Sequence, residues 1–348
     1  FDNSAMDGYA IIASDATAGA RLRVVAEQPA GRTRDLCVSR GEAIRIFTGA
    51  PLPNGADAVI MQEDVEREAD EIVLRQDVQP GEFVRRRGGD VAAGQMIVRA
   101  GERIRPETIA LLASQGLKEL EVGGEVTAAI VSTGDELVAP GVALQPGQIY
   151  ESNTPLLRAL LSQLGVRVLS VVHSPDRQES IEAAVRAGIT ADILIISGGV
   201  SVGARDLVKP ALAAAGAELD LWRVAVKPGK PFLFGHAGRC SIFGLPGNPV
   251  SAFVTFLLFV RPAALRMMRA GETALEMPKQ SAVLVSAVHN DGDRPHYMRG
   301  AVEGGRFTPL PRQESHALFG LSRSNALLLV APHERFDAGG AVTVFTWE

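Results

Sequence analysis

The chain has 348 residues, of which 46% are hydrophobic, and its formal net charge at pH 7 is −5. This length suffices for two to four domains at roughly 100 to 200 residues each. The charge is small and, apart from Arg85-Arg86-Arg87, the basic residues are spread along the chain, which argues against a nucleic-acid-binding surface as the main function.

Residues 1–86 have the pattern of a small β-rich domain. Strand-like runs separated by Gly, Pro and Asp clusters are found at 44–49, 57–62 and 71–76. Residues 87–123 follow as a connector segment. One helix is expected there, with Pro106 in its first turn and Gly116 at its end.

Residues 124–272 contain mostly apolar runs, several of them separated by segments of helix length. The runs lie at 126–132, 166–172, 192–197 and 221–226. Such runs suit strands buried on both faces, so we expect a three-layer α/β domain with a mostly parallel sheet. Helices are expected at 154–165, 177–188 and about 206–216, the first capped by Asn153 or Thr154.

Residues 273–348 return to β character. Short runs separated by turns lie at 281–288, 296–304, 326–332 and 341–347. This spacing predicts a barrel-like or sandwich-like β domain of about 75 residues. The chain as a whole is therefore expected to be multidomain, with an α/β centre flanked by β domains.

Cysteine content and hydropathy favour a cytoplasmic protein. Cys37 and Cys240 have no Cys or His partner at metal-ligand spacing, so no disulfide framework or zinc site is expected. The apolar stretch 252–260 ends at Arg261-Pro262, short of the ~20 residues of a membrane span. The start has no export pattern and no initiator Met, so we expect the natural chain to begin earlier, with a segment that completes the connector.

A glycine-rich loop, SGGVSVGARD, follows one predicted buried strand. Gly198-Gly199 comes directly after the strand, where α/β proteins place their ligands. The backbone N–H groups and serine hydroxyls of this loop suit a phosphate or a pterin-like ligand. An ordinary turn capped by Asp206 is the alternative, and this loop alone does not decide between them.

Two further loops have residues that suit an anion. KPGKP presents Lys227 and Lys230 in a stretch stiffened by two prolines, although a solvated loop between strands is the simpler interpretation. GLPGNPVSA leads from a strand into a helix, where Asn248 could cap and Pro249 fits the first turn. The free N–H groups there would attract negative charge, but a plain helix start is also consistent.

Acidic residues follow the first strand of the predicted sheet. Asp135 and Glu136 are expected at the same edge as the glycine loop, where they would repel a bound phosphate. A divalent cation with oxygen ligands, most plausibly Mg²⁺, would remove this conflict. Solvated loop acids are the alternative.

Taken in chain order, these stretches resemble the MoeA family, the molybdopterin molybdenumtransferases, and the C-terminal enzyme part of gephyrin. The resemblance covers nearly the whole chain and rests on the motifs DNSAMDGYA, TGAP, RRRGGD, STGDEL, GQIYESN, SGGVSVG, KPGKP and GLPGNPVSA. It implies hydrolysis of adenylylated molybdopterin and insertion of molybdate, which yields molybdenum cofactor and AMP with Mg²⁺ present. It also implies a MogA-like central domain and a homodimer in which acids of one subunit's β-rich domain, including Asp7, complete the partner's site.

The resemblance assigns roles by motif. The acidic and polar catalytic set would be Asp7, Thr48, Asp90, Glu136 and Asp206, with Glu136 and Asp206 as Mg²⁺ ligands. The substrate and molybdate region would be lined by Ser197, Gly198, Gly199, Ser201, Lys227, Lys230, Pro246, Pro249 and Ser251. Arg299 and Ser322 would be further anion contacts from the C-terminal domain. One departure is HSPD at 173–176, where the family often has Asp-Asp-Pro, so that Asp176 is shifted from the family acid.

Two other functions fit parts of the chain. The α/β domain alone is similar to MogA-type enzymes, which adenylylate molybdopterin, but the additional domains and the acids of DNSAMDGYA speak against an ATP-using nucleotidyltransferase. A non-catalytic gephyrin-like scaffold is the second alternative. The full set of carboxylates and lysines makes a purely structural role a poor fit. A MogA-type adenylyltransferase and molybdoenzymes are instead expected as partners.

Overall fold

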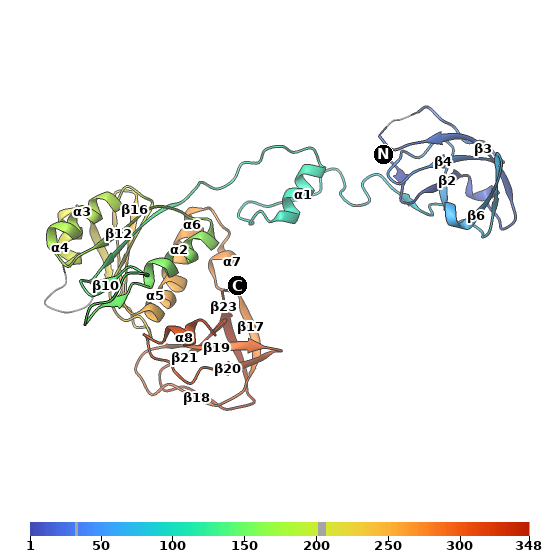
Figure 1. The fold of residues 1–348 in the computed structure, drawn as a ribbon. Coiled ribbons are helices and arrows are strands. Elements are labelled where there is room, and N and C mark those ends of the chain that lie inside the picture. Colours follow the sequence, from blue (N-terminus) through green and yellow to red (C-terminus); the bar gives the residue numbers. More distant parts are fainter. Residues whose placement is uncertain (32–33, 201–206, 348) are drawn as a thin grey trace. The chain divides into compact units, whose positions relative to one another are not determined.

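The computed structural model describes residues 1–31, 34–200 and 207–347. They form two compact units, Phe1–Ile97 and Val98–Glu348 (Figure 1). The boundary lies within the segment that the sequence predicts to be a connector.

The first unit is built around a six-stranded sheet in the order β5-β2-β4-β3-β7-β6. Its strands are β2 (Gly8–Ile11), β3 (Arg21–Gln28), β4 (Glu42–Ile46), β5 (Ala58–Met61), β6 (Val65–Glu68) and β7 (Glu71–Leu74). The chain also forms a short pair, β1 (Asn3–Ser4) with β8 (Val84–Arg85), and two single turns, η1 (Ala13–Asp15) and η2 (Gln62–Asp64). Tyr9, Ile11, Leu22 and Ile72 form much of the core. The predicted β-rich character is confirmed.

The predicted connector helix is α1 (Pro106–Ser114), which belongs to the second unit. Pro106 occupies its first turn, where the missing N–H costs nothing. Gly116 follows the helix with a left-handed backbone, φ +80°, as predicted for a glycine that ends a helix.

The second unit contains a six-stranded sheet in the order β12-β9-β13-β16-β15-β14. Its strands are β9 (Thr127–Thr133), β12 (Arg167–Ser174), β13 (Ile193–Ser197), β14 (Glu218–Trp222), β15 (Leu233–Ala237) and β16 (Cys240–Leu245). The first four in sheet order are parallel, while β15 runs antiparallel to both of its neighbours, β16 and β14. The mostly parallel α/β prediction is confirmed.

Two of the predicted buried strands are not buried. The run at 166–172 falls in β12, one edge of the sheet, where Leu169 and Val171 are exposed. The run at 221–226 contributes only its first residues to β14, which lies at the other edge of the sheet with all five residues exposed. An edge strand has a neighbour on one side only, so its apolar residues are not enclosed. The indole of Trp222 is instead covered by the charged side chains of Lys209 and Arg223.

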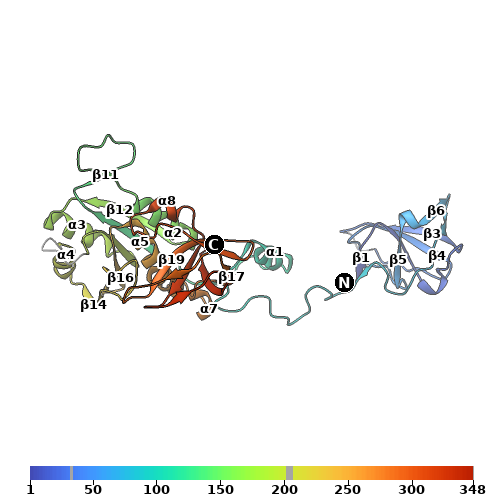
Figure 2. The ribbon, with the colours of Figure 1, turned by 90° about the horizontal axis from the view of Figure 1, so that it is seen from below.

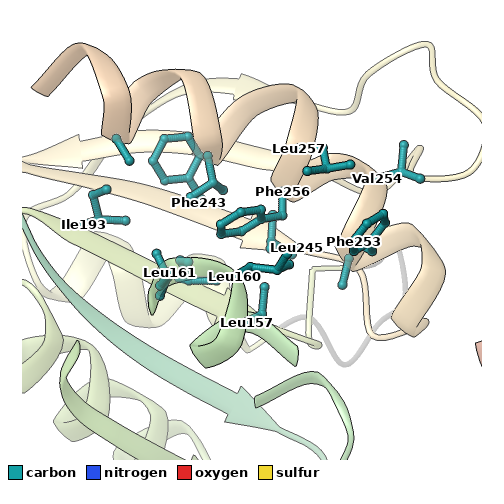
Figure 3. Packing of buried hydrophobic residues seen from close by; sticks show 14 of the residues in the cluster. Leu157, Leu160, Leu161, Ile193, Phe243, Leu245, Phe253, Val254, Phe256 and Leu257 are labelled. Atoms are coloured by element: carbon teal, nitrogen blue, oxygen red, sulfur yellow. The ribbon is translucent and has the colours of Figure 1, made fainter. Parts of the chain in front are cut away.

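Helices cover both faces of this sheet. They are α2 (Asn153–Leu164), α3 (Gln178–Gly188), α4 (Val208–Ala214), α5 (Pro249–Thr255), the π-helical segment η3 (Phe256–Val260) and α6 (Arg261–Met267). A short helix with no buried residue, α7 (Glu272–Leu275), follows α6. Side chains of α2, α5 and η3 pack on one face, and those of α3 and α4 on the other. Figure 3 shows the first of these interfaces, where Leu157 and Leu161 face Phe243, Leu245 and Phe256.

The segments α5, η3 and α6 form one continuous helix, Pro249–Met267, of 19 residues. By length and composition alone it could cross a membrane, so the expectation that this stretch is too short for a membrane span is wrong. Pro262 does not break the helix because it falls in the first turn of α6, after a π-helical segment that relaxes the usual hydrogen-bond ladder. Most of this helix's apolar window is buried, as expected of a core helix.

The C-terminal residues form a closed barrel in the order β17-β20-β19-β21-β23. Its elements are β17 (Lys279–Leu284), β19 (His296–Glu303), β20 (Arg306–Pro309), β21 (Ala326–Val330) and β23 (Ala341–Thr346), with α8 (Leu318–Leu321) and the pair β18 (Val288–His289) and β22 (Arg335–Phe336) beside it. The barrel-like prediction is confirmed. Leu321 and Leu327 share a core with Phe253 of α5, so the barrel packs directly on the α/β layer.

Candidate functional site

Three parallel strands of the α/β sheet end side by side. Ser197 at the end of β13 is paired with Ser132 of β9 and with Leu245 of β16. The loops that follow these strands therefore meet at one sheet edge. Strand β15 begins at the same edge because it runs antiparallel to β16, so that the KPGKP loop just before it lies there too.

Both glycines after β13 are required by the backbone. Gly198 and Gly199 have left-handed φ values of +91° and +65°. A Cβ atom on Gly198 would lie 2.7 Å from the carbonyl oxygen of Thr133, and one on Gly199 would lie 2.8 Å from the Thr133 hydroxyl oxygen. The loop therefore turns tightly over the end of β9, as the motif predicts. Ser201 and Asp206 lie outside the described residues.

Asn153 joins two of these loops, and the sequence reasoning considered it only as a helix cap. Its side-chain nitrogen donates hydrogen bonds of 2.8 Å to the Ser197 hydroxyl and of 2.8 Å to the Gly247 carbonyl. The side chain is buried and does not cap α2. The N-cap residue is Ser152, and the Glu151 carboxylate accepts a hydrogen bond of 2.8 Å from the Thr154 N–H in the first turn. A single asparagine in a short motif carries no sequence signal for this bridging contact.

The lysine loop is held by the C-terminal barrel. The Lys227 N–H donates to Pro295, and the Lys227 carbonyl accepts from Tyr297, at 2.9 and 2.8 Å. On the other side, Gly229 packs against α5, where a Cβ atom would lie 2.5 Å from a methyl group of Thr255. Both ammonium groups, of Lys227 and Lys230, are exposed. A fixed backbone that presents two exposed cations is what an oxyanion site requires.

The start of α5 differs from the predicted cap. Asn248 makes no side-chain cap; its amide instead donates to the Ser315 hydroxyl at 2.9 Å. The Val250 N–H donates to the Ser315 carbonyl at 3.1 Å, so one of the expected free amides is already used. Pro249 begins the helix as predicted, and Pro246 and Ser251 are buried beside it.

Arg299 and Ser322 make intramolecular contacts. The buried Arg299 guanidinium donates to the carbonyls of Ala317, Arg312 and Glu314 at 2.8 to 3.0 Å. As placed here it organises the loop that carries Ser315. The exposed Ser322 donates its hydroxyl to the Phe319 carbonyl at 2.8 Å. Their predicted role as anion contacts stays a prediction.

The acids that follow β9 are exposed. Asp135 accepts a hydrogen bond of 3.0 Å from the Asp176 N–H, which brings the shifted acid Asp176 to this edge. The Glu136 carboxylate folds back on Gly134, where a Cβ atom would lie 2.6 Å from it. Among the described residues, no three His, Cys, Asp or Glu side chains gather closely enough to hold a metal ion. Glu136 by itself is not a complete Mg²⁺ site.

In the first unit, Asp7 and Thr48 are in contact. Asp7 accepts hydrogen bonds from the Thr48 N–H and hydroxyl, both at 2.8 Å. These two bonds, together with the positive charge of Arg45, hold the pKa of the exposed Asp7 below its usual value. Asp90 is exposed in a turn, and no described hydrogen bond links it to this pair.

Other residues of the DNSAMDGYA motif shape the turn around Asp7. Asp2 binds the Arg86 guanidinium at 2.6 Å and accepts from the Arg87 N–H at 2.9 Å. A side chain on Gly8 would collide with the carbonyl oxygen of Ile60 on the neighbouring strand. The motif therefore combines structural residues with an exposed, ionised carboxylate.

A surface pocket of about 440 Å³ lies at the opposite, amino edge of the α/β sheet. Arg239 and Arg266 line it together with Asp192, which accepts hydrogen bonds from the Thr127 N–H and hydroxyl. Since β9 runs from Thr127 to Thr133, this pocket is at the far end of the strand from the glycine loop. It is separate from the candidate site.

Three family models match successive parts of the chain. They are the MoeA N-terminal region (domain I and II) at residues 1–116, the probable molybdopterin binding domain at 129–266 and the MoeA C-terminal region (domain IV) at 281–347. The middle match contains the sheet and loops described above.

Relatives match over nearly the whole length. The chain is 37% identical to molybdopterin molybdenumtransferase 2 of Mycobacterium tuberculosis, covering 100% of this chain and 88% of that protein. It is 36% identical to the molybdopterin molybdenumtransferase of Haemophilus influenzae, with coverages of 99% and 87%. A solved molybdopterin biosynthesis MoeA protein from Pyrococcus horikoshii is 30% identical, with a TM-score of 0.82 over 100% of this chain and 88% of the other. The chain thus belongs to the MoeA family.

Proposed function

We propose that this chain is a molybdopterin molybdenumtransferase, which hydrolyses adenylylated molybdopterin to AMP and inserts molybdate to form molybdenum cofactor. One observation carries the proposal. The glycine loop after β13, the fixed lysine loop and the start of α5 converge at one edge of a sheet, in a chain whose relatives bear this name. The family matches on both sides of the central domain disfavour a MogA-type adenylyltransferase.

The two kinds of loop suit the two parts of the substrate. Lys227 and Lys230 present positive charge on a rigid backbone, so they would bind molybdate and phosphate oxygens without reorganising. The Gly198-Gly199 turn lets the substrate approach the backbone closely. Water attacks the phosphorus, AMP leaves, and the freed terminal phosphate stays with the pterin. The two dithiolene sulfurs replace an oxide ligand of molybdate, which leaves as water with the two thiol protons, so the oxidation state of molybdenum does not change.

Mg²⁺ is proposed as the cation that offsets the acidic charge at this edge. Glu136 would be one ligand and Asp206, outside the described residues, the other. A hard cation with carboxylate oxygens is the expected chemistry. The described residues do not complete such a site by themselves.

We further propose a cytoplasmic homodimer in which Asp7, Thr48 and Asp90 of one subunit complete the site of the other. Their exposure, and the ionised state of Asp7, would suit residues that act on a second chain. Mixing Asp7→Ala chains with Lys230→Ala chains would test this. Shared sites predict that the mixture regains activity that neither variant has alone, whereas sites within one chain predict no recovery.

The function itself is tested by AMP release. Wild-type protein is incubated with adenylyl-molybdopterin, Mg²⁺ and molybdate, and AMP and molybdenum cofactor are measured in the same samples. Asp206→Ala is the test variant. The matched control is Arg335→Ala, at an exposed residue of β22 that is paired with Asp337. Turnover in the wild type and the control but not in Asp206→Ala supports the proposal. Absence of turnover by folded, dimeric wild-type protein favours a scaffold, and consumption of ATP favours an adenylyltransferase.

A further inference from the structure

Two buried polar atoms at the candidate site lack hydrogen-bond partners among the described residues. They are the side-chain oxygen of Asn153 and the hydroxyl oxygen of Thr133. The two residues are only 7% and 4% exposed. A buried polar atom without a partner is costly, so each such atom in a native protein calls for an explanation, such as a ligand or an ordered water.

The orientation of the Asn153 amide follows from its partners. The Gly247 carbonyl can only accept a hydrogen bond, so the NH₂ group of Asn153 must face it, and the same nitrogen reaches the Ser197 hydroxyl. Rotating the amide would set two oxygens against each other. The carboxamide oxygen is therefore the group that is left over, and it is an acceptor only.

The Thr133 hydroxyl lies directly behind the glycine pair. Its oxygen would be 3.2 Å from a Cβ atom at Gly198 and 2.8 Å from one at Gly199. Gly199 itself is exposed, so the hydroxyl lies behind a residue that reaches the surface. Both unpaired atoms thus border the loops that follow β13 and β16.

The Asn153 oxygen can contact only those parts of the substrate that donate a hydrogen bond. The Asn153 oxygen has no proton to donate, so it cannot bind molybdate or an ionised phosphate, and it requires an N–H or O–H donor. The lysine loop at the same edge has the opposite preference, for oxyanions. In adenylylated molybdopterin the N–H donors are on the two heterocycles, pterin and adenine, and the O–H donors are the ribose hydroxyls; of these, the rigid edge of a heterocycle loses the least freedom when it is bound.

We propose that Asn153 and Thr133 bind an N–H edge of the substrate's heterocycle, while the lysines bind its anionic part. This inference rests on the proposed function. It adds two substrate-contact residues that the sequence reasoning did not assign. Asn153 would also position the site, because its NH₂ group joins the loops that carry Ser197 and Gly247.

The test uses two threonines at opposite ends of strand β9. Thr133→Val removes a hydroxyl without a partner, and Thr127→Val removes one that donates to Asp192 at 2.7 Å. Both changes keep the size of the side chain. Thermal unfolding and the Kd for adenylyl-molybdopterin are measured for the full-length wild type and both variants.

We expect the two variants to behave in opposite ways. Thr133→Val should be as stable as the wild type or more so, yet bind the substrate about tenfold more weakly, the effect of one lost hydrogen bond. Thr127→Val should be less stable and bind normally. Separate titrations with molybdopterin and with AMP then identify the heterocycle, because only the ligand that contacts Thr133 loses affinity.

Unchanged binding by Thr133→Val, with normal binding and turnover by the wild type, overturns the inference and leaves the proposed function standing. A loss of stability without a loss of affinity does the same, because it assigns the hydroxyl to a structural water. If the wild type neither binds nor turns over adenylyl-molybdopterin, the proposed function fails, and the inference fails with it.

Discussion

His296 should make the stability of the second unit depend on pH. It begins β19, is 4% exposed, and its Nε2 atom has no partner among the described residues. Burial lowers the pKa of His296 from 6.5 to about 4. The positive charges of Lys227, Arg299 and Arg294 act in the same direction. The folded protein therefore keeps this imidazole neutral.

The size and sign of this pH dependence follow from the difference in proton binding between the folded and the unfolded chain. The unfolded chain takes up a proton at this histidine near pH 6.5, whereas the folded chain does so only near pH 4. Between these values the unfolded state binds more protons, so stability falls as the pH falls. Because the pKa falls from 6.5 to about 4, the free energy of unfolding decreases by ~3 kcal/mol between pH 6.5 and pH 4.

The assay is urea unfolding followed by tryptophan fluorescence. The chain has two tryptophans, Trp222 and Trp347, and both lie in the second unit, so the signal reports on that unit alone. The free energy of unfolding is measured between pH 7 and pH 4 for the wild type, for His296→Gln and for His289→Gln. His289 is an exposed histidine of the same barrel region and serves as the matched control.

We expect His296→Gln to lose most of the pH dependence and His289→Gln to keep it. If the wild type and His296→Gln lose stability in parallel between pH 6.5 and pH 4, the buried histidine does not control this transition and the reasoning is wrong.

Three further experiments, one thiol labelling and two substitutions, test other parts of the structure. Burial raises the pKa of the Cys240 thiol to about 11, whereas Cys37 is exposed. One thiol should therefore react with a disulfide reagent in the native protein and the second only after unfolding. Rapid reaction of both thiols in the native protein would contradict the fold. Gly8→Ala should destabilise the first unit by about 3 kcal/mol or more, because the new methyl group collides with the Ile60 carbonyl oxygen. The variant should then be cleaved by a protease within residues 1–97 at a lower urea concentration than the wild type. Arg299→Lys should destabilise the second unit by roughly 2–4 kcal/mol, since one ammonium group cannot reach three carbonyls; an unchanged fluorescence transition would argue against this network.

The sequence predicts the α/β sheet well where its strands are enclosed. The run at 126–132 matches β9 closely because both faces of that strand are buried and its central residues, 128–131, are all apolar. The run at 221–226 looks similar but starts in an edge strand, β14. Which strand ends up at the edge is decided by the topology of the whole sheet, which the local pattern does not contain.

The same limit explains the long helix. The apolar run 252–260 stops at Arg261-Pro262 in the sequence, but Pro262 follows the π-helical segment η3, and the chain remains helical to Met267. Packing of this helix against α2 and the sheet overrides the local preference. Periodicity alone does not reveal such a segment.

The candidate site was predictable where it consists of glycines, lysines and prolines in compact motifs. The Gly198-Gly199 turn and the fixed lysine loop are geometric requirements that are visible in the sequence. Asn153 and Thr133 were missed because their environment exists only when the ends of β9, β13 and β16 meet. Figure 2 shows that the chain around β11 (Ile149–Tyr150), just before Asn153, projects from the sheet. The residues just before Asn153 are therefore typical of an exposed loop, and they do not indicate that the asparagine is buried.

In the proposed function, hydrolysis of adenylyl-molybdopterin is coupled to insertion of molybdenum into the pterin product. The most direct measurement is the molar ratio of AMP to molybdenum bound to the pterin product, determined in one sample with wild-type protein, adenylyl-molybdopterin, Mg²⁺ and molybdate. The account predicts equal amounts of both products, and no molybdenum-bound product when molybdate is omitted. AMP released without any molybdenum in the product, or ATP consumed to make adenylyl-molybdopterin, would contradict it.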